Sequence, residues 1–352
     1  MKYRIHWWNI VKILLLFVLC SVFFYAWESS GPNLDDLLFP SKVDLFAVRN
    51  LLLATNSVQH HLPSPLNSIT FKLLLGNKIR CLSKNSPTQN TPDLIFLVKT
   101  KPDLFERRQI IRKTWANKSH FKSCGLSVRT LFIMGRLHKS SAKLERLQDM
   151  LEQESRNLQD IVQFDFIDSF ENIPYKLMAS FEFIIRYCSG VKFITVVDDD
   201  FLIHPKNLVR TVLEVKGSQY LTYIQGRIYV RDEVKRDPMS KWYVSEAQYP
   251  FPYYPPFPCG GTIILSLPMV RVISVGFRYA KLLFIDDVMI GIILWKLNLA
   301  PIHSPHIYVW DAWENRRLAT MISAHYYGNI DHLLEDWEKI KDDVSCKSLW
   351  TK

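Results

Sequence analysis

The chain has 352 residues, of which 48% are hydrophobic and 22% charged, and its formal net charge at pH 7 is +10. This length and apolar content suffice for one large core or two modest ones. The basic residues are dispersed rather than gathered into stripes, which argues against nucleic-acid binding and favours anionic small substrates or a membrane surface.

The amino terminus predicts a membrane anchor. Residues 13–27 are apolar except for Ser21, and the charges before them are all basic, namely Lys2, Arg4 and Lys12. A helix over residues 7–27 would reach about 31 Å, close to the thickness of a bilayer core. Because no basic residue directly follows the span, we expect residues 1–27 to be a cytoplasmic tail and uncleaved signal-anchor. A cleaved signal peptide is the alternative, although the sequence offers only a poor cleavage site.

The segment after the anchor predicts a luminal stem over residues 28–91. Prolines recur through it, and no hydrophobic period is sustained. Residues 44–54 and 69–76 are nevertheless apolar enough to form short helices that pack on the rest of the luminal part. The short apolar span suits the thinner membranes of the early secretory pathway, so we expect a membrane protein of that pathway with a luminal carboxyl-terminal part.

The cysteines fit an oxidising lumen, where disulfides persist. Cys20 lies in the anchor, and five more follow it, namely Cys81, Cys124, Cys188, Cys259 and Cys346. Because five is odd, at most two disulfides can form within the chain and one thiol is left over. The spacings contain no C-x-x-C pair, which argues against structural zinc. The sequon NKS at Asn117 fits N-glycosylation of a luminal surface.

From residue 92 onward, apolar strands alternate with amphipathic helices. We expect strands at residues 93–100, 127–135, 160–168 and 191–197, and helices at residues 106–117, 141–157 and 175–188. This order indicates an α/β domain, predicted to extend over residues 92–352, with a mostly parallel sheet. Ligands bind outside the carboxyl ends of the strands in such sheets.

Three consecutive carboxylates follow the last of these strands: Asp198, Asp199 and Asp200. Without a nearby cation they would repel one another and remain hydrated. Two carboxylates in a D-x-D pattern past a strand end can face one divalent cation, and oxygen ligands suit Mg²⁺ or Mn²⁺ on a diphosphate. A solvated acidic turn is the alternative interpretation.

A second acidic pair, Asp286 and Asp287, begins a strongly apolar helix. A helix cap would explain the pair, since an Asp there satisfies unpaired amides. A general base is the other hypothesis, and the helix dipole would keep its carboxylate ionised.

Residues 248–266 combine prolines and aromatic rings with the pair Gly260–Gly261. This composition fits a surface polyproline segment. It also fits a sugar-binding cleft in which sugar faces stack on rings and the glycines allow close backbone approach.

The order of these motifs resembles the β-1,3-glycosyltransferase family, which includes β-1,3-galactosyltransferases and β-1,3-N-acetylglucosaminyltransferases. The matching blocks lie within residues 92–299 and read RRQIIRKTW, FIMG, ESRNLQDIVQFDFIDSFENIPYK, VVDDDFLIHPKNL, YPPFPCGGTIILS and IDDVMIGIILWKL. The resemblance implies a GT-A-like fold in a type II Golgi membrane protein. It also implies inverting transfer of a hexose, galactose or N-acetylhexosamine, from a UDP-sugar to a glycan hydroxyl, forming a β-1,3 linkage on a glycoprotein or glycolipid.

The resemblance further implies roles for individual residues. Asp198 and Asp200 match the D-x-D that holds Mn²⁺ on the donor diphosphate, and Asp287 matches the general base. His325, in ISAHYYG, matches a late His that would be an additional metal ligand. The implied donor-binding residues are Arg108, Arg112, Lys176, Asp198 and Asp199. For both arginines, for Lys176 and for Trp115 of the same helix motif, packing and helix-surface pairing are the alternative.

Several positions depart from the family pattern. Asp286 replaces a Glu, and Val196 stands where a Lys commonly precedes the D-x-D. Thr262 and Ile263 stand where Gly and an aromatic residue are usual, and NIPYK replaces N-L-T-x-K. These changes leave the predicted metal and base positions intact but bear on donor and acceptor identity, so we expect a divergent member.

Two other classes of function remain open from the sequence. A non-catalytic glycan-binding relative could keep the fold without turnover, but the retention of Asp200 and Asp287 argues against it. A metal-dependent phosphohydrolase could also use the aspartates, but a two-metal site would need more ligands.

Overall fold

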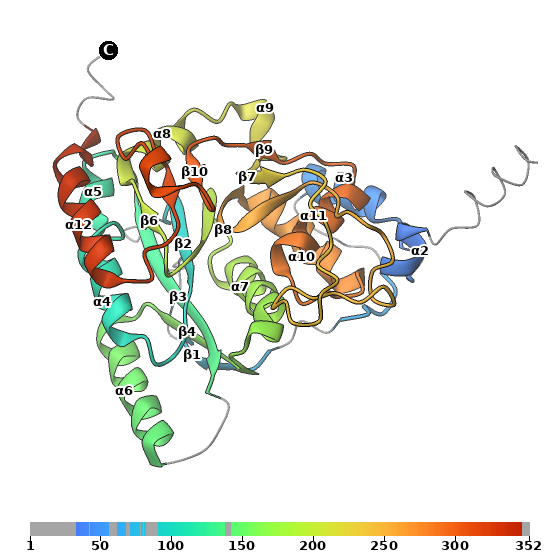
Figure 1. Ribbon diagram of the computed structural model, residues 1–352, viewed down its shortest axis with the longest axis horizontal. Helices are drawn as coiled ribbons and strands as arrows, with labels where there is room; N and C mark the ends of the chain where they lie inside the picture. Colours follow the sequence, from blue (N-terminus) through green and yellow to red (C-terminus); the bar gives the residue numbers. More distant parts are fainter. Residues whose placement is uncertain are drawn as a thin grey trace, which may run out of the picture. The chain divides into compact units, whose positions relative to one another are not determined.

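The computed structural model describes residues 33–41, 43–55, 62–67, 71–77, 79, 81, 91–137 and 142–346 (Figure 1). The chain divides into two compact units, Met1–Pro40 and Ser41–Lys352. The described part of the first unit holds the short helix α2 (Leu34–Leu38), which is capped by the Asn33 side chain. The predicted anchor, residues 1–27, lies outside the described residues. Among the helices that the structure describes, none is long and apolar enough to span a membrane.

An eight-stranded mixed sheet forms the centre of the second unit. Its strands lie in the order β1 (Leu73–Leu75), β4 (Ile161–Ile167), β3 (Val128–Arg136), β2 (Leu94–Lys99), β5 (Phe193–Asp198), β8 (Phe257–Ser266), β7 (Ile224–Tyr229) and β9 (Ile302–His303). Strands β4, β3, β2 and β5 are parallel, whereas β8 is antiparallel to both of its neighbours. The four predicted strands and the α/β class with a mixed sheet are therefore confirmed.

The prediction of a helix over residues 69–76 is wrong for its described part. Residues 73–75 form β1, which pairs antiparallel with β4. The open edge of β4 offers hydrogen bonds to an extended segment, and a helix this short would be marginal in water. Gly76, at φ 99°, then takes the chain out of the strand in a conformation that favours glycine.

Helices cover both faces of the sheet (Figure 1). On one face α7 (Ile173–Tyr187), α10 (Leu267–Tyr279) and α11 (Asp286–Lys296) pack on one another, and α3 (Leu45–Thr55) packs on α10. The helices on the other face include α4 (Phe105–Lys113), α5 (Lys118–Lys122), α8 (Pro205–Leu213) and α12 (Ile330–Ile340), and Leu151 of a further helix, α6 (Ala142–Leu158), joins the same core.

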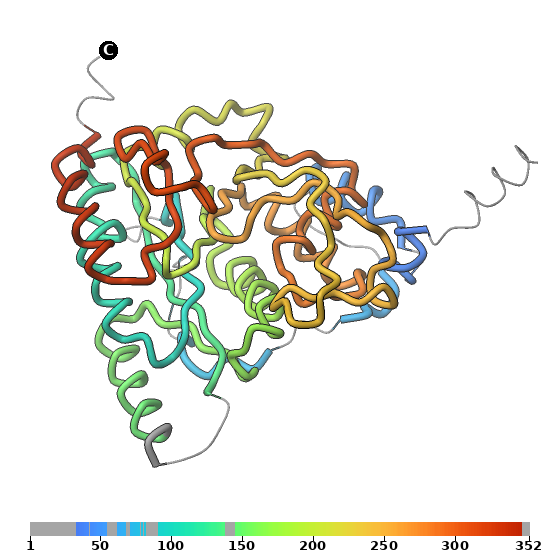
Figure 2. Tube along the Cα trace, viewed as in Figure 1, coloured from blue at the N-terminus to red at the C-terminus, as the bar shows by residue number. Residues whose placement is uncertain are grey.

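The remaining elements are short, apart from one helix. They are α6 (Ala142–Leu158), α9 (Gly217–Tyr220), the 3₁₀ turns η1 (Phe170–Asn172), η2 (Trp313–Asn315) and η3 (Lys341–Asp343), and a small sheet of β10 (Ile307–Tyr308), β11 (Ser323–Ala324) and β6 (Leu202–Ile203). Residues 230–256 form a long, mostly irregular connection between β7 and β8, which Figure 2 traces in yellow and orange.

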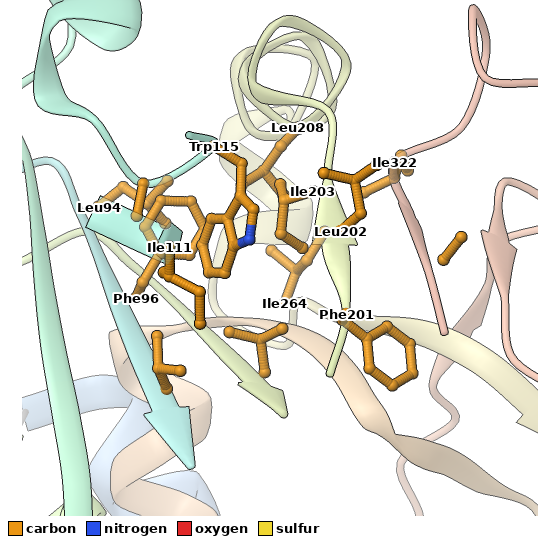
Figure 3. Packing of buried hydrophobic residues seen from close by; sticks show 14 of the residues in the cluster. Leu94, Phe96, Ile111, Trp115, Phe201, Leu202, Ile203, Leu208, Ile264 and Ile322 are labelled. Atoms are coloured by element: carbon orange, nitrogen blue, oxygen red, sulfur yellow. The ribbon is translucent and has the colours of Figure 1, made fainter. Parts of the chain in front are cut away.

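The side chains of β2 alternate between the two faces of the sheet. Leu94, Phe96 and Val98 enter the core under α4 and α5, where the Trp115 ring lies edge-on to Phe96 at 5.3 Å (Figure 3). Because side chains alternate along a strand, Lys99 must leave the sheet on the opposite face, toward α7 and α11. Trp115, which the sequence placed in a motif with two arginines, is fully buried in this core.

Two disulfides join segments that are distant in sequence. Cys81 is bonded to Cys188 at the end of α7, and Cys124 is bonded to Cys346. Cys259 on β8 is the free thiol among the described residues, which confirms the expected two bridges with one cysteine left over. Cys81 and β1 belong to the segment expected to be a stem, yet Cys81 is bonded to the end of α7 and β1 pairs with β4 of the sheet. The boundary at residue 92 stays a prediction.

Candidate active site

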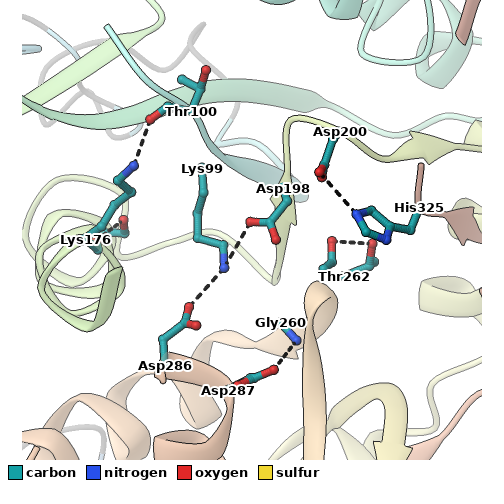
Figure 4. A network of polar contacts seen from close by, with 12 residues as sticks. Lys99, Thr100, Lys176, Asp198, Asp200, Gly260, Thr262, Asp286, Asp287 and His325 are labelled. Atoms are coloured by element: carbon teal, nitrogen blue, oxygen red, sulfur yellow. Dashed lines mark hydrogen bonds and ion pairs between the residues drawn. The ribbon is translucent and has the colours of Figure 1, made fainter. Parts of the chain in front are cut away.

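The carboxyl ends of β2 and β5 bring Lys99 beside the acidic run. Lys99 and Asp198 are register partners on these parallel strands. The Lys99 Nζ lies 3.1 Å from Asp198 Oδ1 and 3.0 Å from Asp286 Oδ2, and the lysine side chain is only 9% exposed (Figure 4). Sequence reasoning missed Lys99, although a lysine that closes an otherwise apolar strand is an unusual signal.

Burial and ion pairing act in opposite directions on this cluster. Burial lowers the pKa of Lys99, but the Asp198 and Asp286 carboxylates more than offset this, so its pKa is raised and the ammonium stays charged. At Asp198 burial dominates and raises the pKa to about 6, with Lys99 opposing and Asp200 adding repulsion. The acidic run is therefore short of positive charge, and a further cation would favour its ionised form.

Asp200 faces His325 rather than Lys99. The His325 Nε2 lies 3.2 Å from Asp200 Oδ2, and its Nδ1 lies 3.2 Å from the carbonyl oxygen of Val309. Because a carbonyl only accepts hydrogen bonds, Nδ1 carries the proton of the neutral ring, and Nε2 then presents a lone pair to the carboxylate. Two acceptors at this distance repel one another unless a proton or a metal cation lies between them.

Further features of this pair fit a cation. Burial raises the pKa of Asp200, but a protonated, charged His325 that donates to the carboxylate outweighs the burial and lowers the pKa; a metal cation in the place of that proton would act in the same direction. The second oxygen of Asp200, Oδ1, is buried without a hydrogen-bond partner in the described structure. An imidazole whose other N–H is fixed by a carbonyl is the usual arrangement of a metal-ligating histidine. Asp200 and His325 therefore suit a divalent cation.

Phe201 fixes the orientation of the His325 ring. The two rings are stacked, with centroids 4.9 Å apart and an interplanar angle of 20°. Phe201 also lies against Gly261, where an added Cβ would come within 1.9 Å of the Phe201 ring. Gly261 is thus needed for this packing, whereas a Cβ on Gly260 would meet the Asp287 side chain at 3.3 Å.

The three predicted metal ligands are not gathered around one point. Asp198 pairs with Lys99, while Asp200 pairs with His325. Within the described ranges, no group of three or more His, Cys, Asp or Glu side chains lies in position to hold a metal. The pKa of Asp199 is raised, mainly by burial, and its Oδ2 has no hydrogen-bond partner in that part of the chain. An ion held by Asp200 and His325 would take its other ligands from substrate oxygens and water.

The two arginines expected to bind the donor are engaged elsewhere. Arg108 is fully buried and donates hydrogen bonds from Nε and Nη2 to the Glu154 carboxylate. It also donates to the backbone carbonyls of Lys101 and Pro102. Arg112 pairs with Glu154 at 2.7 Å and with Asp160 at 2.8 Å. These ion pairs tie α4 to α6 and to the turn before β4, which matches the packing alternative.

Lys176 has a similar role on α7. Its Nζ lies 2.9 Å from Asp168 Oδ1 and 2.8 Å from the carbonyl oxygen of Thr100, just past the end of β2. Arg107, which sequence reasoning missed, instead reaches the acidic loop. It donates to the Tyr327 carbonyl at 2.9 Å and to the Asp199 carbonyl at 3.4 Å. Two adjacent arginines on a helix point in different directions, so the sequence motif alone did not show which one faces the site.

Asp287 lies at the first turn of α11, against β8. Its Oδ2 accepts the N–H of Gly260 at 2.9 Å, and its Oδ1 accepts the N–H of Val288 at 2.8 Å. Burial raises the pKa of Asp287 to about 7, with added repulsion from Asp286, while the Gly260 N–H and the charge of Lys99 oppose the rise. This corrects the expectation that the helix dipole keeps the carboxylate ionised. A pKa near neutrality is, however, what a general base at neutral pH requires.

Asp287 lines an aromatic pocket of about 460 Å³. Five rings contribute to its wall, those of Tyr229, Trp242, Tyr254, Phe257 and Trp310. Tyr254 and Phe257 belong to the segment 248–266, so that segment lines a cavity beside the predicted base. Sugar rings stack their apolar faces on such aromatic side chains, and a pocket of this size is in the range of small-molecule sites.

A larger cavity, about 860 Å³, lies at the opposite ends of β2 and β3 and is lined by none of the predicted catalytic or metal-binding side chains. Asn117, the predicted glycosylation site, is on its wall. The Asn117 Oδ1 accepts the N–H of Ser119 at 3.0 Å and caps α5, so the residue also has a structural role.

Several known proteins are similar to this chain. Residues 106–305 match a family model described as Galactosyltransferase. Beta-1,3-galactosyltransferase 1 of Mus musculus is 30% identical over 284 residues, covering 80% of this chain and 81% of the relative. Lactosylceramide 1,3-N-acetyl-beta-D-glucosaminyltransferase of Homo sapiens is 29% identical over 348 residues, covering 96% of this chain and 86% of the relative. The solved galactosyltransferase LgtC, in complex with donor and acceptor sugar analogues, has 12% identity and a TM-score of 0.38, covering 70% of this chain and 95% of the other.

Proposed function

The chain belongs to the galactosyltransferase family and is a hexosyltransferase, and we propose that it moves galactose or an N-acetylhexosamine from a UDP-sugar to a glycan hydroxyl. The product would be a β-1,3 linkage on a glycoprotein or glycolipid, formed with inversion. The observation that carries this proposal is the position of Asp287, a carboxylate with a pKa of about 7 on the wall of an aromatic pocket.

Asp287 would act as the general base toward an acceptor in that pocket. The acceptor hydroxyl gives its proton to the Asp287 carboxylate while its oxygen forms the new bond to the anomeric carbon of the donor. The bond from that carbon to the UDP oxygen breaks, and UDP leaves with the electron pair of that bond. Because the acceptor oxygen attacks the face opposite to UDP, the configuration at the anomeric carbon is inverted. The Gly260 N–H, bound to Asp287 Oδ2, holds the carboxylate in place during this transfer.

Asp200 and His325 would hold a divalent cation on the donor side, and we propose Mn²⁺ with Asp198 as the second carboxylate of the D-x-D. Support comes from the unpartnered Oδ1 of Asp200 and from the lone pair of His325 Nε2. When bound, the cation supplies positive charge that stabilises the leaving diphosphate. Arg107, whose guanidinium fixes the backbone of this loop, helps to keep Asp200 toward His325.

The protein would work in the Golgi membrane as a single-pass type II protein with its catalytic part in the lumen. The basic residues before the apolar run support this orientation. The two disulfides fit an oxidising compartment. Protease treatment of intact microsomes should spare the carboxyl-terminal part, and its digestion without detergent would rule this orientation out.

A donor and acceptor panel tests the reaction. The full-length protein in detergent is incubated with UDP-galactose, UDP-N-acetylglucosamine or UDP-N-acetylgalactosamine, with Mn²⁺ and with β-galactosides or β-N-acetylglucosaminides as acceptors. We expect one donor and acceptor combination to give Mn²⁺-dependent transfer and a β-1,3 product by NMR. Acceptor binding without transfer from any donor would instead indicate the alternative, a non-catalytic glycan-binding relative.

A further inference from the structure

Lys99 connects the two acidic motifs of the site. Its Nζ contacts Asp198, two residues before Asp200, and Asp286, which directly precedes Asp287 (Figure 4). One buried ammonium group thus lies between the donor-side loop and the start of α11. Of the basic side chains that the structure describes, Lys99 is the one with ion pairs to both motifs.

We propose that Lys99 is a positioning residue that sets the distance between the donor-side carboxylates and the base on α11. This inference rests on the proposed function, since it assigns separate roles to the two motifs. Without the ammonium, the carboxylates of Asp198 and Asp286 would face each other across the largely buried position of the Lys99 side chain, and their repulsion would push the start of α11 away from β5.

A substitution on β5 supports this role. Val196 is buried and pairs with Leu97, at the position where the family pattern has a lysine. Lys99 pairs with Asp198 two residues further along the same two strands, so both positions face the same side of the sheet. A lysine at position 196 would therefore place its ammonium on the same face of the sheet as Lys99.

The other basic groups nearby do not replace it. Lys176 is held by Asp168 and by the Thr100 carbonyl, and Arg107 donates to backbone carbonyls. Neither side chain bridges the two acidic motifs. Removal of the Lys99 charge should therefore change the positions of the carboxylates in both motifs.

The expected effects on binding and on transfer have opposite signs. An ammonium near a divalent-cation site opposes cation binding, so an uncharged residue 99 should strengthen UDP binding in the presence of Mn²⁺. The same change frees the start of α11, so the base loses its alignment and transfer slows. A lysine that only stabilised the fold would lower the melting temperature without producing this opposite pair.

The experiment compares full-length Lys99→Met with wild type in detergent, using calorimetry with UDP and Mn²⁺, transfer with the active donor and acceptor, and thermal melting. We expect UDP to bind about threefold or more tighter, from the reduced charge repulsion. We expect kcat to fall by roughly tenfold to a hundredfold, as misplacement of a catalytic group by about 1 Å can cause. Lys101→Met, which removes an exposed lysine from the same segment, is the matched control and should change neither quantity.

A charge-relocation variant adds a rescue. Val196→Lys in the Lys99→Met background returns an ammonium to the same face of the sheet, and kcat should recover to within about threefold of wild type if charge at this place is what matters. If Lys99→Met does not fold, Lys99→Gln, which keeps hydrogen bonding without charge, is put through the same measurements with the same expectations.

Each other result would overturn the proposal. Weaker UDP binding would make Lys99 a donor ligand, and a normal rate per folded molecule would leave it a purely structural residue. If wild type transfers no sugar, the proposed function fails, but UDP and Mn²⁺ binding still decides the role of Lys99: tighter binding in the variant supports the bridge, and unchanged or weaker binding refutes it. If wild type does not bind UDP with Mn²⁺, both proposals fall.

Discussion

The acidic runs after β5 and at the start of α11 look alike in sequence, but they have different partners in the fold. After β5, Asp198 and Asp200 are each 38% exposed at the side chain, and they turn to Lys99 and to His325 respectively. At α11, Asp286 pairs with the Lys99 ammonium, and the hydrogen-bond donors to Asp287 within the described residues are the backbone N–H groups of Gly260 and Val288. Partner chemistry rather than residue type distinguishes the proposed metal-binding carboxylates from the proposed proton acceptor, and substitutions in each run can test that distinction.

The largest effect is expected from Asp287→Asn. An amide of the same size cannot accept the acceptor proton, so turnover should fall by roughly 10²–10⁴-fold, the usual contribution of general-base catalysis. UDP binding should remain nearly intact, because the donor-side pair is untouched. The amide keeps one acceptor oxygen, so one of the two bonds from the Gly260 and Val288 N–H groups is lost, at a cost of about 1 kcal/mol of unfolding free energy.

Turnover and melting temperature should be measured on the same preparation of this variant. A helix cap would give the opposite pattern, a lower melting temperature with a normal rate per folded molecule. Wild-type turnover in Asp287→Asn would remove Asp287 from the mechanism and make the two acidic runs equivalent.

Asp200→Ala should abolish Mn²⁺-dependent UDP binding, because it removes the carboxylate that faces His325. The loss should exceed the roughly 10- to 100-fold typical of outer-shell partners of a metal. Calorimetry with UDP and Mn²⁺ measures it. An affinity equal to that of wild type would identify the acidic run as a solvated turn.

The pH dependence of transfer should reflect Asp287. A base with a pKa of about 7 is protonated below that value, so kcat should fall by about tenfold per pH unit on the acid side and level off above neutrality. The side chains that face it include Asp286 on its own helix, Lys99 from β2, Cys259 from β8, and Tyr254 with Asp232, Glu233 and Lys235 from the connection between β7 and β8.

The same raised pKa should affect stability. The folded protein holds the Asp287 proton more tightly than the unfolded chain, whose carboxyl has the ordinary value of 3.8. Stability from this group is therefore full below about pH 4 and is lost as the pH rises through about 7. Melting curves of wild type should show this loss, and those of Asp287→Asn should lack it; identical pH profiles would mean that the carboxyl is not perturbed.

The smallest effect on transfer is expected from Arg112→Met. This change removes the ion pairs to Glu154 and Asp160, and hydrogen bonds to charged groups contribute about 1.5–3 kcal/mol each, so the melting temperature should drop. The UDP affinity of the folded variant should stay within about twofold of the wild-type value, because the Arg112 side chain pairs with Glu154 and Asp160 and not with the donor. A large loss of UDP affinity would restore the donor-binding role that the sequence suggested.

Much of the fold was readable from the sequence because the central strands are continuous apolar runs. β2 and β5 are buried along nearly their whole length, so composition and order sufficed to find them. β1 was misassigned because a short apolar run fits a helix or a strand equally well, and only the free edge of β4 decides between them.

Candidate site residues could be proposed from the sequence where they lie in a motif, but not where their partners are distant in sequence. Motif order singled out Asp200, Asp287 and His325 as candidates, and their roles stay predictions. Lys99 could not, since its role depends on the register of β2 with β5 and on the place where α11 begins. Arg108 had no visible counter-ion in its motif, because its partner Glu154 lies on another helix.

The bond between Cys124 and Cys346 has a consequence for biosynthesis. Its sulfurs are separated by 222 residues of chain, so the bond cannot close until all of that length has been translated, about 10 to 45 s at ordinary elongation rates. His325 also emerges late in that interval, long after Asp200. The Gly260–Asp287 contact can form while the ribosome is still extending the chain, whereas the Asp200–His325 pair waits for residues near the end of it. The contact of the proposed base can therefore form before the proposed cation-binding pair is complete.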